Sequence, residues 1–152
     1  MNVVLVEPEI PQNTGNIART CALTGSVLHL VRPLGFSLED RYLKRAGLDY
    51  WEHIQVVEWN SLEELIRSNL EGQYWLATTG ADRRYSEVSY GPDDFLVFGK
   101  ETKGLSKGIL DMFPGCHIRI PMLDIGRSLN LSNSVAVALY EALRQQNFPG
   151  LR

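Results

Sequence analysis

Six short runs of largely apolar residues recur along the chain, separated by segments with helical periodicity. The runs are rich in β-branched and aromatic residues, which is typical of strands. They lie at Val3–Glu7, Val27–Val31, Ile54–Trp59, Tyr74–Thr79, Phe95–Gly99 and His117–Met122. Because runs of this kind lack a polar face, the sheet that they form is expected to be covered on both sides. The pattern predicts an α/β fold with about six mainly parallel strands and helices on both faces.

The segments between the runs carry helix signals. Gly25 stands where a helix-stopping glycine belongs, and Ser61 with Glu64 has the spacing of a capping box. We expect helices at Thr14–Leu23, Ser37–Arg45, Leu105–Phe113 and Leu131–Gln146, and one from Ser61 to about Leu70. The stretch Gly80–Asp94 is polar and weakly periodic, so we expect a mobile loop there.

The last of these helices is preceded by more polar residues than it needs. Ser128, Asn130, Ser132 and Asn133 crowd around its start, with leucines between them. One side chain, from Ser128, Asn130 or Ser132, can accept hydrogen bonds from the free N–H groups of the first turn. The surplus of polar residues therefore indicates a second role for this segment.

The composition indicates one globular domain that spans residues 1–152. Apolar residues make up 44% of the chain and charged residues 22%, and the length suffices to bury a core. The longest apolar run, Val135–Tyr140, is far too short to cross a bilayer. The N-terminus lacks the basic start of a signal peptide. We therefore expect a cytoplasmic protein with no membrane partner.

The net charge of −3 argues against a broad nonspecific surface for nucleic acid. Local basic clusters occur at Arg41, Lys44 and Arg45, at Arg83 and Arg84, and at Lys100, Lys103 and Lys107. Taken alone, each cluster is typical of a solvated face. Cys21 and Cys116 have neither the spacing of a redox pair nor that of a metal site, so we expect two small buried residues.

Four segments rich in Gly, Pro, Asn and Ser follow predicted strands. They lie at Glu7–Asn16, Thr78–Arg84, Gly99–Gly104 and Met122–Asn130. In open α/β sheets, ligands bind beyond the carboxyl ends of the strands. The composition of these segments and their position after the strands therefore both predict a binding site at the carboxyl edge of the sheet.

Several common motifs are excluded at this edge. Gly99 and Gly104 have the spacing of P-loop glycines, but Leu105 stands where that motif requires Lys. A dinucleotide-binding glycine fingerprint, a nucleophile elbow and a metal-ligand cluster are also absent from the sequence. His29 and His117 lie inside apolar runs, where we expect core histidines with backbone partners. What remains is a small-molecule site built from backbone and small polar groups.

Three segments, Asn13–Arg19, Leu96–Leu105 and Ile120–Gln145, resemble the three motifs of the SPOUT-class RNA 2′-O-methyltransferases. The linking stretch Arg32–Trp51 resembles the small single-domain branch of that class, which methylates the wobble nucleotide, cytidine or uridine, of leucine tRNAs. The resemblance implies a homodimer, S-adenosylmethionine as methyl donor, S-adenosylhomocysteine as product, and no metal. It also implies a deep trefoil knot near the C-terminus, which general folding rules do not suggest.

The resemblance also implies roles for individual residues. The methyl donor would contact Ala77, Thr78, Thr79, Gly99, Glu101, Gly104, Ile120, Met122, Ser128, Leu129 and Leu131. The catalytic residues would be Asn13, Arg19, Ser128 and Asn130. RNA would contact Arg19, Lys44, Arg45, Lys103 and Arg127.

Two of these assignments leave alternatives. Because a guanidinium keeps its proton, we expect Arg19 to clamp an RNA phosphate and stabilise the developing alkoxide, and not to act as a base. Tyr140 is expected either in the core or beside the active site of a dimer. The function could also be methylation of another tRNA or ribosomal RNA nucleotide, or RNA binding without catalysis.

Overall fold

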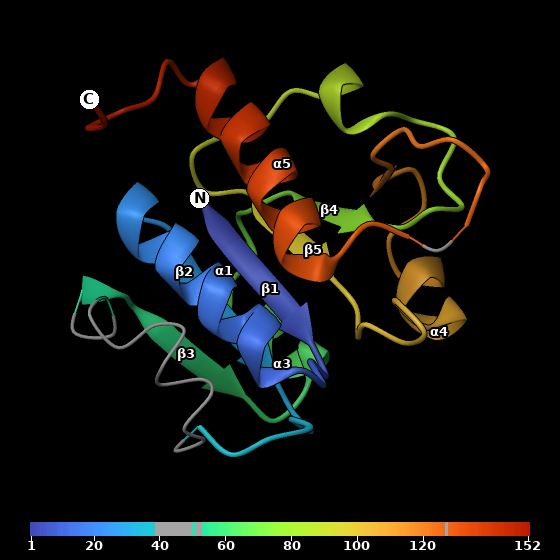
Figure 1. The fold of residues 1–152 in the computed structure, drawn as a ribbon, viewed down its shortest axis with the longest axis horizontal. Helices are drawn as coiled ribbons and strands as arrows, with labels where there is room; N and C mark the ends of the chain where they lie inside the picture. Colours follow the sequence, from blue (N-terminus) through green and yellow to red (C-terminus); the bar gives the residue numbers. More distant parts are fainter. Residues whose placement is uncertain (39–49, 51–52, 127) are drawn as a thin grey trace.

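The structure, a computed structural model, describes residues 1–38, 50, 53–126 and 128–152. Its strands are β1 (Asn2–Val6), β2 (Val27–Val31), β3 (Val56–Trp59), β4 (Tyr74–Ala77), β5 (Phe95–Phe98) and β6 (His117–Ile118). They form one parallel sheet in the order β3-β2-β1-β5-β4-β6, which confirms the predicted fold class (Figure 1). Most of the expected helix Ser37–Arg45 lies outside the described residues, as do Lys44 and Arg127.

The strand β6 is much shorter than the predicted run His117–Met122. Pro121 has no N–H to donate to a neighbouring strand, so regular pairing cannot continue through it. Arg119 instead forms an isolated bridge with Arg84, from the segment after β4. The prediction was right about the position of this strand and wrong about its length, because the partner strand β4 ends at Ala77, opposite Ile118.

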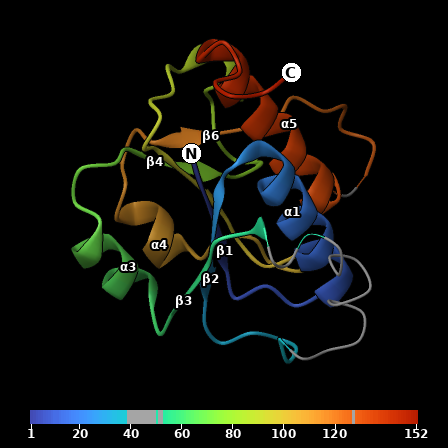
Figure 2. The ribbon, with the colours of Figure 1, turned by 90° about the vertical axis from the view of Figure 1, so that its left-hand side faces the viewer.

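Two pairs of helices cover the two faces of the sheet. The helices α1 (Pro11–Thr24) and α5 (Leu131–Gln145) pack on one face, and α3 (Leu62–Ser68) and α4 (Lys107–Asp111) on the other (Figure 2). Successive strand residues point to opposite faces. Accordingly, Val3 and Leu5 belong to the core under α1 and α5, whereas Val4 and Val6 belong to the other core. Among the described residues, no helix is both long and apolar enough to cross a membrane.

The helix ends follow their local signals with small differences. α1 begins at Pro11, three residues before the predicted Thr14, because proline suits the first turn of a helix. Gly25 closes α1 in the left-handed conformation, with φ 65°, as predicted. Ser61 caps α3, but the carboxylate of Glu64 accepts from the backbone N–H of Asn60, so only half of the predicted capping box forms.

The segment Gly80–Asp94 is a loop, as predicted, but it is anchored to the core and does not have the freedom of a mobile loop. The segment contains a short 3-10 turn, and both Val88 and Tyr90 are buried in the core beside α5. Gln145 of α5 holds the segment from both sides: its Oε1 accepts from Tyr90 N (3.1 Å) and its Nε2 donates to Val88 O (3.0 Å). A glutamine more than 50 positions away supplies the order, so local periodicity could not reveal it.

The two cysteines differ in burial. Cys21 lies on the buried face of α1 and is fully buried, as predicted. Cys116 is only half-buried, and its Sγ accepts a hydrogen bond from Gln73 Nε2 at 3.1 Å. The expectation of two buried cysteines is therefore wrong for Cys116, which lies just before the short edge strand β6.

Of the two strand histidines, His29 is buried, as predicted, whereas His117 is only half-buried, so the prediction of a core residue is wrong for His117. His117 Nε2 lies 2.9 Å from Leu110 O, whereas His29 bonds with side chains. Its Nδ1 accepts from Trp59 Nε1 (3.0 Å), and its Nε2 lies 3.2 Å from Asn2 Oδ1. Burial lowers the pKa of His29 from 6.5 to about 4.

This shift predicts a loss of stability in mild acid. Between pH 6.5 and 4, His29 is protonated in the unfolded chain but stays neutral in the folded protein. Protonation therefore favours the unfolded state, and the free energy of unfolding falls as the pH drops. We expect about 2 kcal/mol of loss between about pH 7.5 and 4.5. Urea unfolding of the wild type and of His29→Gln should therefore give stabilities that converge in acid. If the difference in free energy of unfolding between the two proteins stayed constant with pH, the expectation would be contradicted.

Candidate active site

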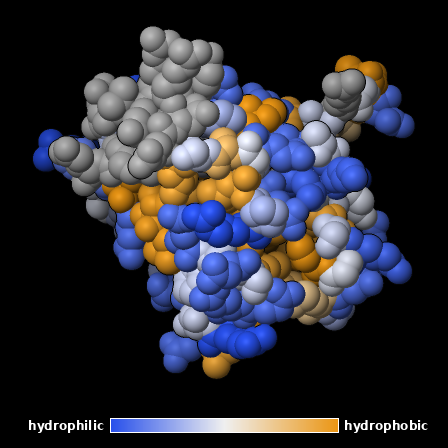
Figure 3. All heavy atoms as spheres, turned by 90° about the horizontal axis from the view of Figure 1, so that it is seen from below, coloured by the Kyte–Doolittle hydropathy of each residue, from blue (hydrophilic) through white to orange (hydrophobic). Residues whose placement is uncertain are grey.

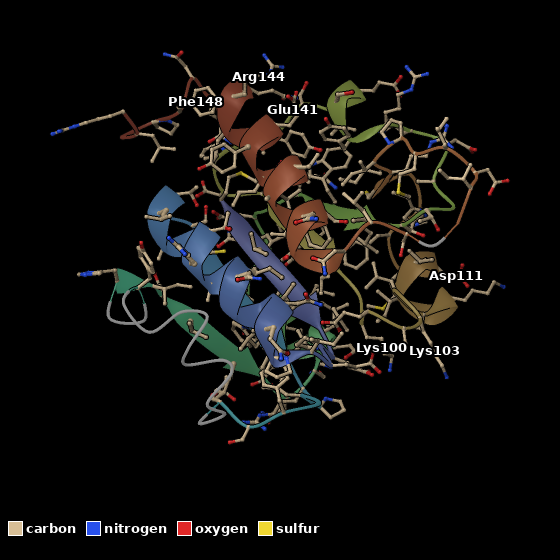
Figure 4. All side chains as sticks on the ribbon, in the orientation of Figure 1. Lys100, Lys103, Asp111, Glu141, Arg144 and Phe148 are labelled. Carbon is tan, nitrogen blue, oxygen red and sulfur yellow. The ribbon has the colours of Figure 1, made fainter. Side chains whose placement is uncertain are left out.

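The carboxyl ends of β1 and β5 lie side by side at the centre of the sheet, where the strand order reverses. The loop after β1 leads into α1, and the loop after β5 leads toward α4. Seen from below, the surface of the molecule mixes hydrophobic and hydrophilic side chains (Figure 3). Lys100 and Lys103, from the loop after β5, lie along the lower side of the molecule (Figure 4).

Glu101 joins this loop to the start of α1. Its Oε2 accepts from the backbone N–H of Glu9 (2.8 Å), and its Oε1 accepts from the backbone N–H of Ile10 (3.2 Å). Ile10 is the N-cap residue of α1 and has no side-chain cap of its own. A carboxylate at a helix N-terminus also interacts favourably with the helix dipole. Glu101 therefore supplies from a distant loop the cap that the local sequence lacks.

The same carboxylate begins a chain of side-chain hydrogen bonds. Glu101 Oε1 accepts from Asn13 Nδ2 (3.0 Å), and Asn13 Oδ1 accepts from Asn130 Nδ2 (3.0 Å). Asn130 Oδ1 then accepts from the backbone N–H of Ser132 (2.9 Å) and of Asn133 (3.3 Å). We call Glu101, Asn13 and Asn130 the amide relay. It connects one residue from each of the three segments that sequence analysis singled out.

The two ends of the amide relay fix the orientation of both amides. A carboxylate can only accept, so the NH₂ group of Asn13 must face Glu101. The backbone N–H groups of α5 can only donate, so the oxygen of Asn130 must face them and its NH₂ group must face Asn13. Asn13 is also buried, at 6% exposure. The site therefore holds Asn13 in one orientation.

The surplus of polar residues before α5 is now divided among definite roles. Asn130 is the N-cap, and the Ser132 hydroxyl bonds to its side-chain oxygen at 2.6 Å. The Ser134 hydroxyl returns to Asn130 O at 3.1 Å. Ser128 and Leu129 precede the cap and are exposed. Asn130 therefore caps the helix, whereas Ser128 takes no part in the cap and stays exposed two residues before it.

Gly99 and Gly104 close the loop after β5 into a tight turn. Lys100 and Gly104 form an isolated antiparallel bridge, with Gly104 N donating to Lys100 O at 2.8 Å. A Cβ on Gly99 would lie 2.1 Å from the carbonyl carbon of Gly104, which no side chain can tolerate. Gly104 itself has φ +65°. Only glycine fits at position 99, and it lets two backbone segments meet at the end of β5.

The other candidate donor residues lie at the end of β4 and just after it, in the segment that follows β6, and at the start of α5. Ala77 ends β4, with Thr78 and Thr79 directly after it, and Thr78 N donates to Ile118 O at 2.9 Å. Ile120 follows β6 and is half-buried, and Leu131 packs against the core. Met122 and Leu129 are 43% and 39% exposed, respectively. These two exposed apolar side chains could cover a ligand bound at this edge.

Arg19 does not join the amide relay. It lies six residues after Asn13 on α1, which turns its side chain by roughly 240° around the helix axis. Its guanidinium carbon lies 4.9 Å from the centre of the Tyr50 ring, and its Nη2 donates to the Tyr50 hydroxyl at 3.3 Å. The tyrosine holds Arg19 on the exposed side of α1, and sequence analysis had given no sign of this contact.

Two further residues at this site, Glu7 and Glu9, were not predicted from the sequence. Glu9 accepts hydrogen bonds from Thr102, and Glu7 forms an ion pair with Lys100. The hydrogen bond that the Lys100 ammonium donates to the Glu7 carboxylate raises the pKa of Lys100. Within the described residues, no group of His, Cys, Asp or Glu side chains is arranged to hold a metal ion.

Comparisons with known proteins agree on one kind of enzyme. The family model described as the SpoU rRNA methylase family matches residues 1–140. The tRNA (cytidine(34)-2'-O)-methyltransferase of Escherichia coli (strain K12) is 47% identical, over 99% of this chain and 96% of that protein.

Two solved structures share the fold over almost the whole chain. One, described as giving insights into 2-OH methylation of C/U34 on tRNA, is 42% identical with a TM-score of 0.91, over 96% of this chain and 95% of that one. The other is an AdoMet-bound rRNA methyltransferase from Sinorhizobium meliloti. It is 26% identical with a TM-score of 0.84, over 94% of this chain and 55% of that one.

Proposed function

The chain belongs to the SpoU rRNA methylase family, and we propose that it methylates the ribose 2′-oxygen of the wobble nucleotide of a tRNA. The amide relay is the observation that carries this proposal, because it joins residues of three distant segments at the ligand-binding edge of the sheet. Near-full-length similarity to a tRNA (cytidine(34)-2'-O)-methyltransferase supports the choice of nucleotide. We propose cytidine or uridine of leucine tRNAs as the target, in a cytoplasmic protein formed by a single domain over residues 1–152.

S-adenosylmethionine is the methyl donor in this proposal, and S-adenosylhomocysteine is the product. The donor has an adenine edge, hydroxyls and a charged amino-acid end, which suits a site with mixed polarity. At Gly99 the backbone of Gly104 and Leu105 packs so closely that no side chain fits, so the turn presents backbone groups to a ligand. The residues that would hold the donor are Ala77, Thr78, Thr79, Gly99, Gly104, Ile120, Met122, Ser128, Leu129 and Leu131. Glu101 borders them, with its carboxylate directed at α1.

When bound, the donor supplies an electrophilic methyl group, and the protein must align the ribose 2′-oxygen with it. Alignment of reacting groups can contribute about 7–11 kcal/mol to lowering a barrier. Asn13 and Asn130 are held in fixed orientations by the amide relay, which suits them for positioning the ribose. Ser128 lies beside Asn130 and would complete this set. Arg19 would clamp an RNA phosphate and stabilise the negative charge that develops on the 2′-oxygen.

RNA contacts in this proposal come from the exposed cations near the site. Arg19 and Lys103 are exposed, on α1 and on the loop after β5 respectively. Lys44, Arg45 and Arg127, which lie outside the described residues, complete the proposed set. Since the whole chain carries a net charge of −3, local cations must supply the attraction for the phosphates.

We also propose a homodimer through the outer face of α1 and α5. Leu23, Val137 and Phe148 are more than a third exposed there, and a cavity of about 560 Å³ adjoins this face. Tyr140 lines the cavity and is 47% exposed. Of its two expected positions, the one in the core is therefore wrong. Phe148 lies far from Lys100 in Figure 4, so such a dimer would leave the loop after β5 accessible. A trefoil knot formed by the segment before α5 remains part of this proposal.

Calorimetry with S-adenosylhomocysteine tests whether the site takes this class of ligand. We expect binding in the micromolar range for the wild type. A matched titration with adenosine should bind more weakly, because it lacks the amino-acid end. If neither ligand bound at millimolar concentration, the enzymatic proposal would fail, and RNA binding without catalysis would become the better explanation.

A further inference from the structure

Two loops at the site are joined by hydrogen bonds that each donates to a glutamate carboxylate of the other. The backbone N–H of Glu9 donates to Glu101 Oε2 at 2.8 Å. In return, Glu9 Oε2 accepts from Thr102 N (3.1 Å) and from the Thr102 hydroxyl (2.8 Å). Each loop thus offers a carboxylate to the backbone of the other. We call Glu9, Glu101 and Thr102 the loop lock.

Neither loop needs the loop lock to form its own turn. The loop after β5 is already closed by the bridge between Lys100 and Gly104. The loop after β1 is held on its other side by Gly35, whose N–H donates to Pro8 O at 2.9 Å. What the lock adds is the placement of one loop relative to the other.

The loop after β1 also carries backbone strain. Glu7 has φ 51°, which is uncommon for a residue other than glycine. Strained residues of this kind persist where the surroundings hold them, and they cluster at functional sites. Glu7 is held by its ion pair with Lys100, which is a further link between the same two loops. The strain and the reciprocal bonds therefore concentrate at one junction beside the amide relay.

We propose that Glu9 and Thr102 are positioning residues for the methyl transfer. By fixing the tip of the loop after β5, they keep the Glu101 carboxylate aimed at Asn13. Through Asn13 they also fix the amide of Asn130 at the start of α5. This role rests on the proposed function, because it assigns the loop lock to alignment of the reacting groups.

The exposure of the loop lock separates this role from a merely structural one. Thr102 is exposed and Glu9 is half-buried, and neither belongs to one of the two hydrophobic cores. Hydrogen bonds near the surface contribute little to the free energy of folding. In contrast, a small displacement of aligned groups can slow a reaction by as much as about a hundredfold. Loss of the lock should therefore lower kcat far more than the melting temperature.

Substitutions at Glu9 and Thr102 test this difference. We expect Glu9→Ala and Thr102→Val each to lower kcat by about tenfold, with an unchanged melting temperature. Glu9→Gln keeps an oxygen for Thr102, and Thr102→Ser keeps the hydroxyl, so both should restore most of the rate. Glu58→Ala is the matched control, because Glu58 is an exposed carboxylate that pairs with Arg32 and lies on the edge strand β3, which β2 separates from β1. Equal rates for Glu9→Ala and this control would overturn the proposal.

A double-mutant cycle tests whether Glu9 acts through Asn13. If it does, Glu9→Ala should cause no further loss once Asn13 is alanine. The four proteins are compared by single-turnover methylation and by their affinity for S-adenosylhomocysteine, so a background with very slow turnover still reports the coupling. If the effects of Glu9→Ala and Asn13→Ala were independent, so that the double variant lost the product of the two single losses in both rate and affinity, the proposal would be overturned. A wild type that methylates no tRNA would instead contradict the proposed function itself.

Discussion

The Gly99→Ala variant is expected to lose most of its affinity for the methyl donor. Its new Cβ would lie 2.1 Å from the carbonyl carbon of Gly104 and 2.3 Å from the nitrogen of Leu105, so the backbone of the loop must shift. Both obstacles are backbone atoms that cannot rotate away. We expect the affinity for the donor to fall by about tenfold or more and the free energy of unfolding to fall by about 2–3 kcal/mol. Calorimetry with S-adenosylhomocysteine and urea unfolding measure the two effects.

Gly108→Ala is the control for this experiment. Gly108 lies in α4, and the nearest atom to a Cβ there is Ser106 Oγ at 4.0 Å. Alanine is favoured over glycine in a helix by about 0.5–1 kcal/mol, so this variant should be as stable as the wild type or slightly more so. Normal donor affinity in Gly99→Ala would show that the turn at Gly99 is not part of the donor site.

Arg19→Lys is expected to lower the rate of methylation by about a hundredfold, which is typical for loss of a group that stabilises a developing oxyanion. Lysine keeps the positive charge but loses the planar fork that binds a phosphate at two points. It also loses the flat guanidinium that lies over Tyr50. Initial rates with tritiated donor and tRNA measure the effect.

Arg67→Lys provides the comparison for this substitution. Arg67 is an exposed arginine near the end of α3, on the opposite face of the sheet from α1. The change in chemistry is the same, and the rate should match that of the wild type. If Arg19→Lys kept nearly full activity, the phosphate clamp assigned to Arg19 would be wrong.

Local sequence patterns predicted the elements of this fold well. The strand Val27–Val31 was predicted to the residue, because a short, mostly apolar run between Gly25 and Pro33 is typical of a strand. Gly25 and Asn130 were both recognised as candidate cap residues, and both serve as caps. These features depend on neighbours within a few positions, which is the range that a sequence pattern can report.

Long-range partners escaped the same kind of reasoning. Glu101 and Asn13 are 88 positions apart, and Asn13 and Asn130 are 117 apart. No local pattern indicates that a carboxylate from one loop will cap a helix that starts in another. The resemblance to the SPOUT class named Asn13, Glu101 and Asn130 separately, but their connection became visible only once the sheet order placed β1 beside β5.

Mass-spectrometric mapping of tRNA tests the central claim most directly. Total tRNA that lacks 2′-O-methylation at the wobble position is incubated with the protein and S-adenosylmethionine, and then digested and sequenced. We predict a new ribose methyl group on the wobble cytidine or uridine of leucine tRNAs, formed with the wild type and strongly reduced with Arg19→Lys. Methylation only at another nucleotide, or no methylation of any tRNA, would contradict the proposed function.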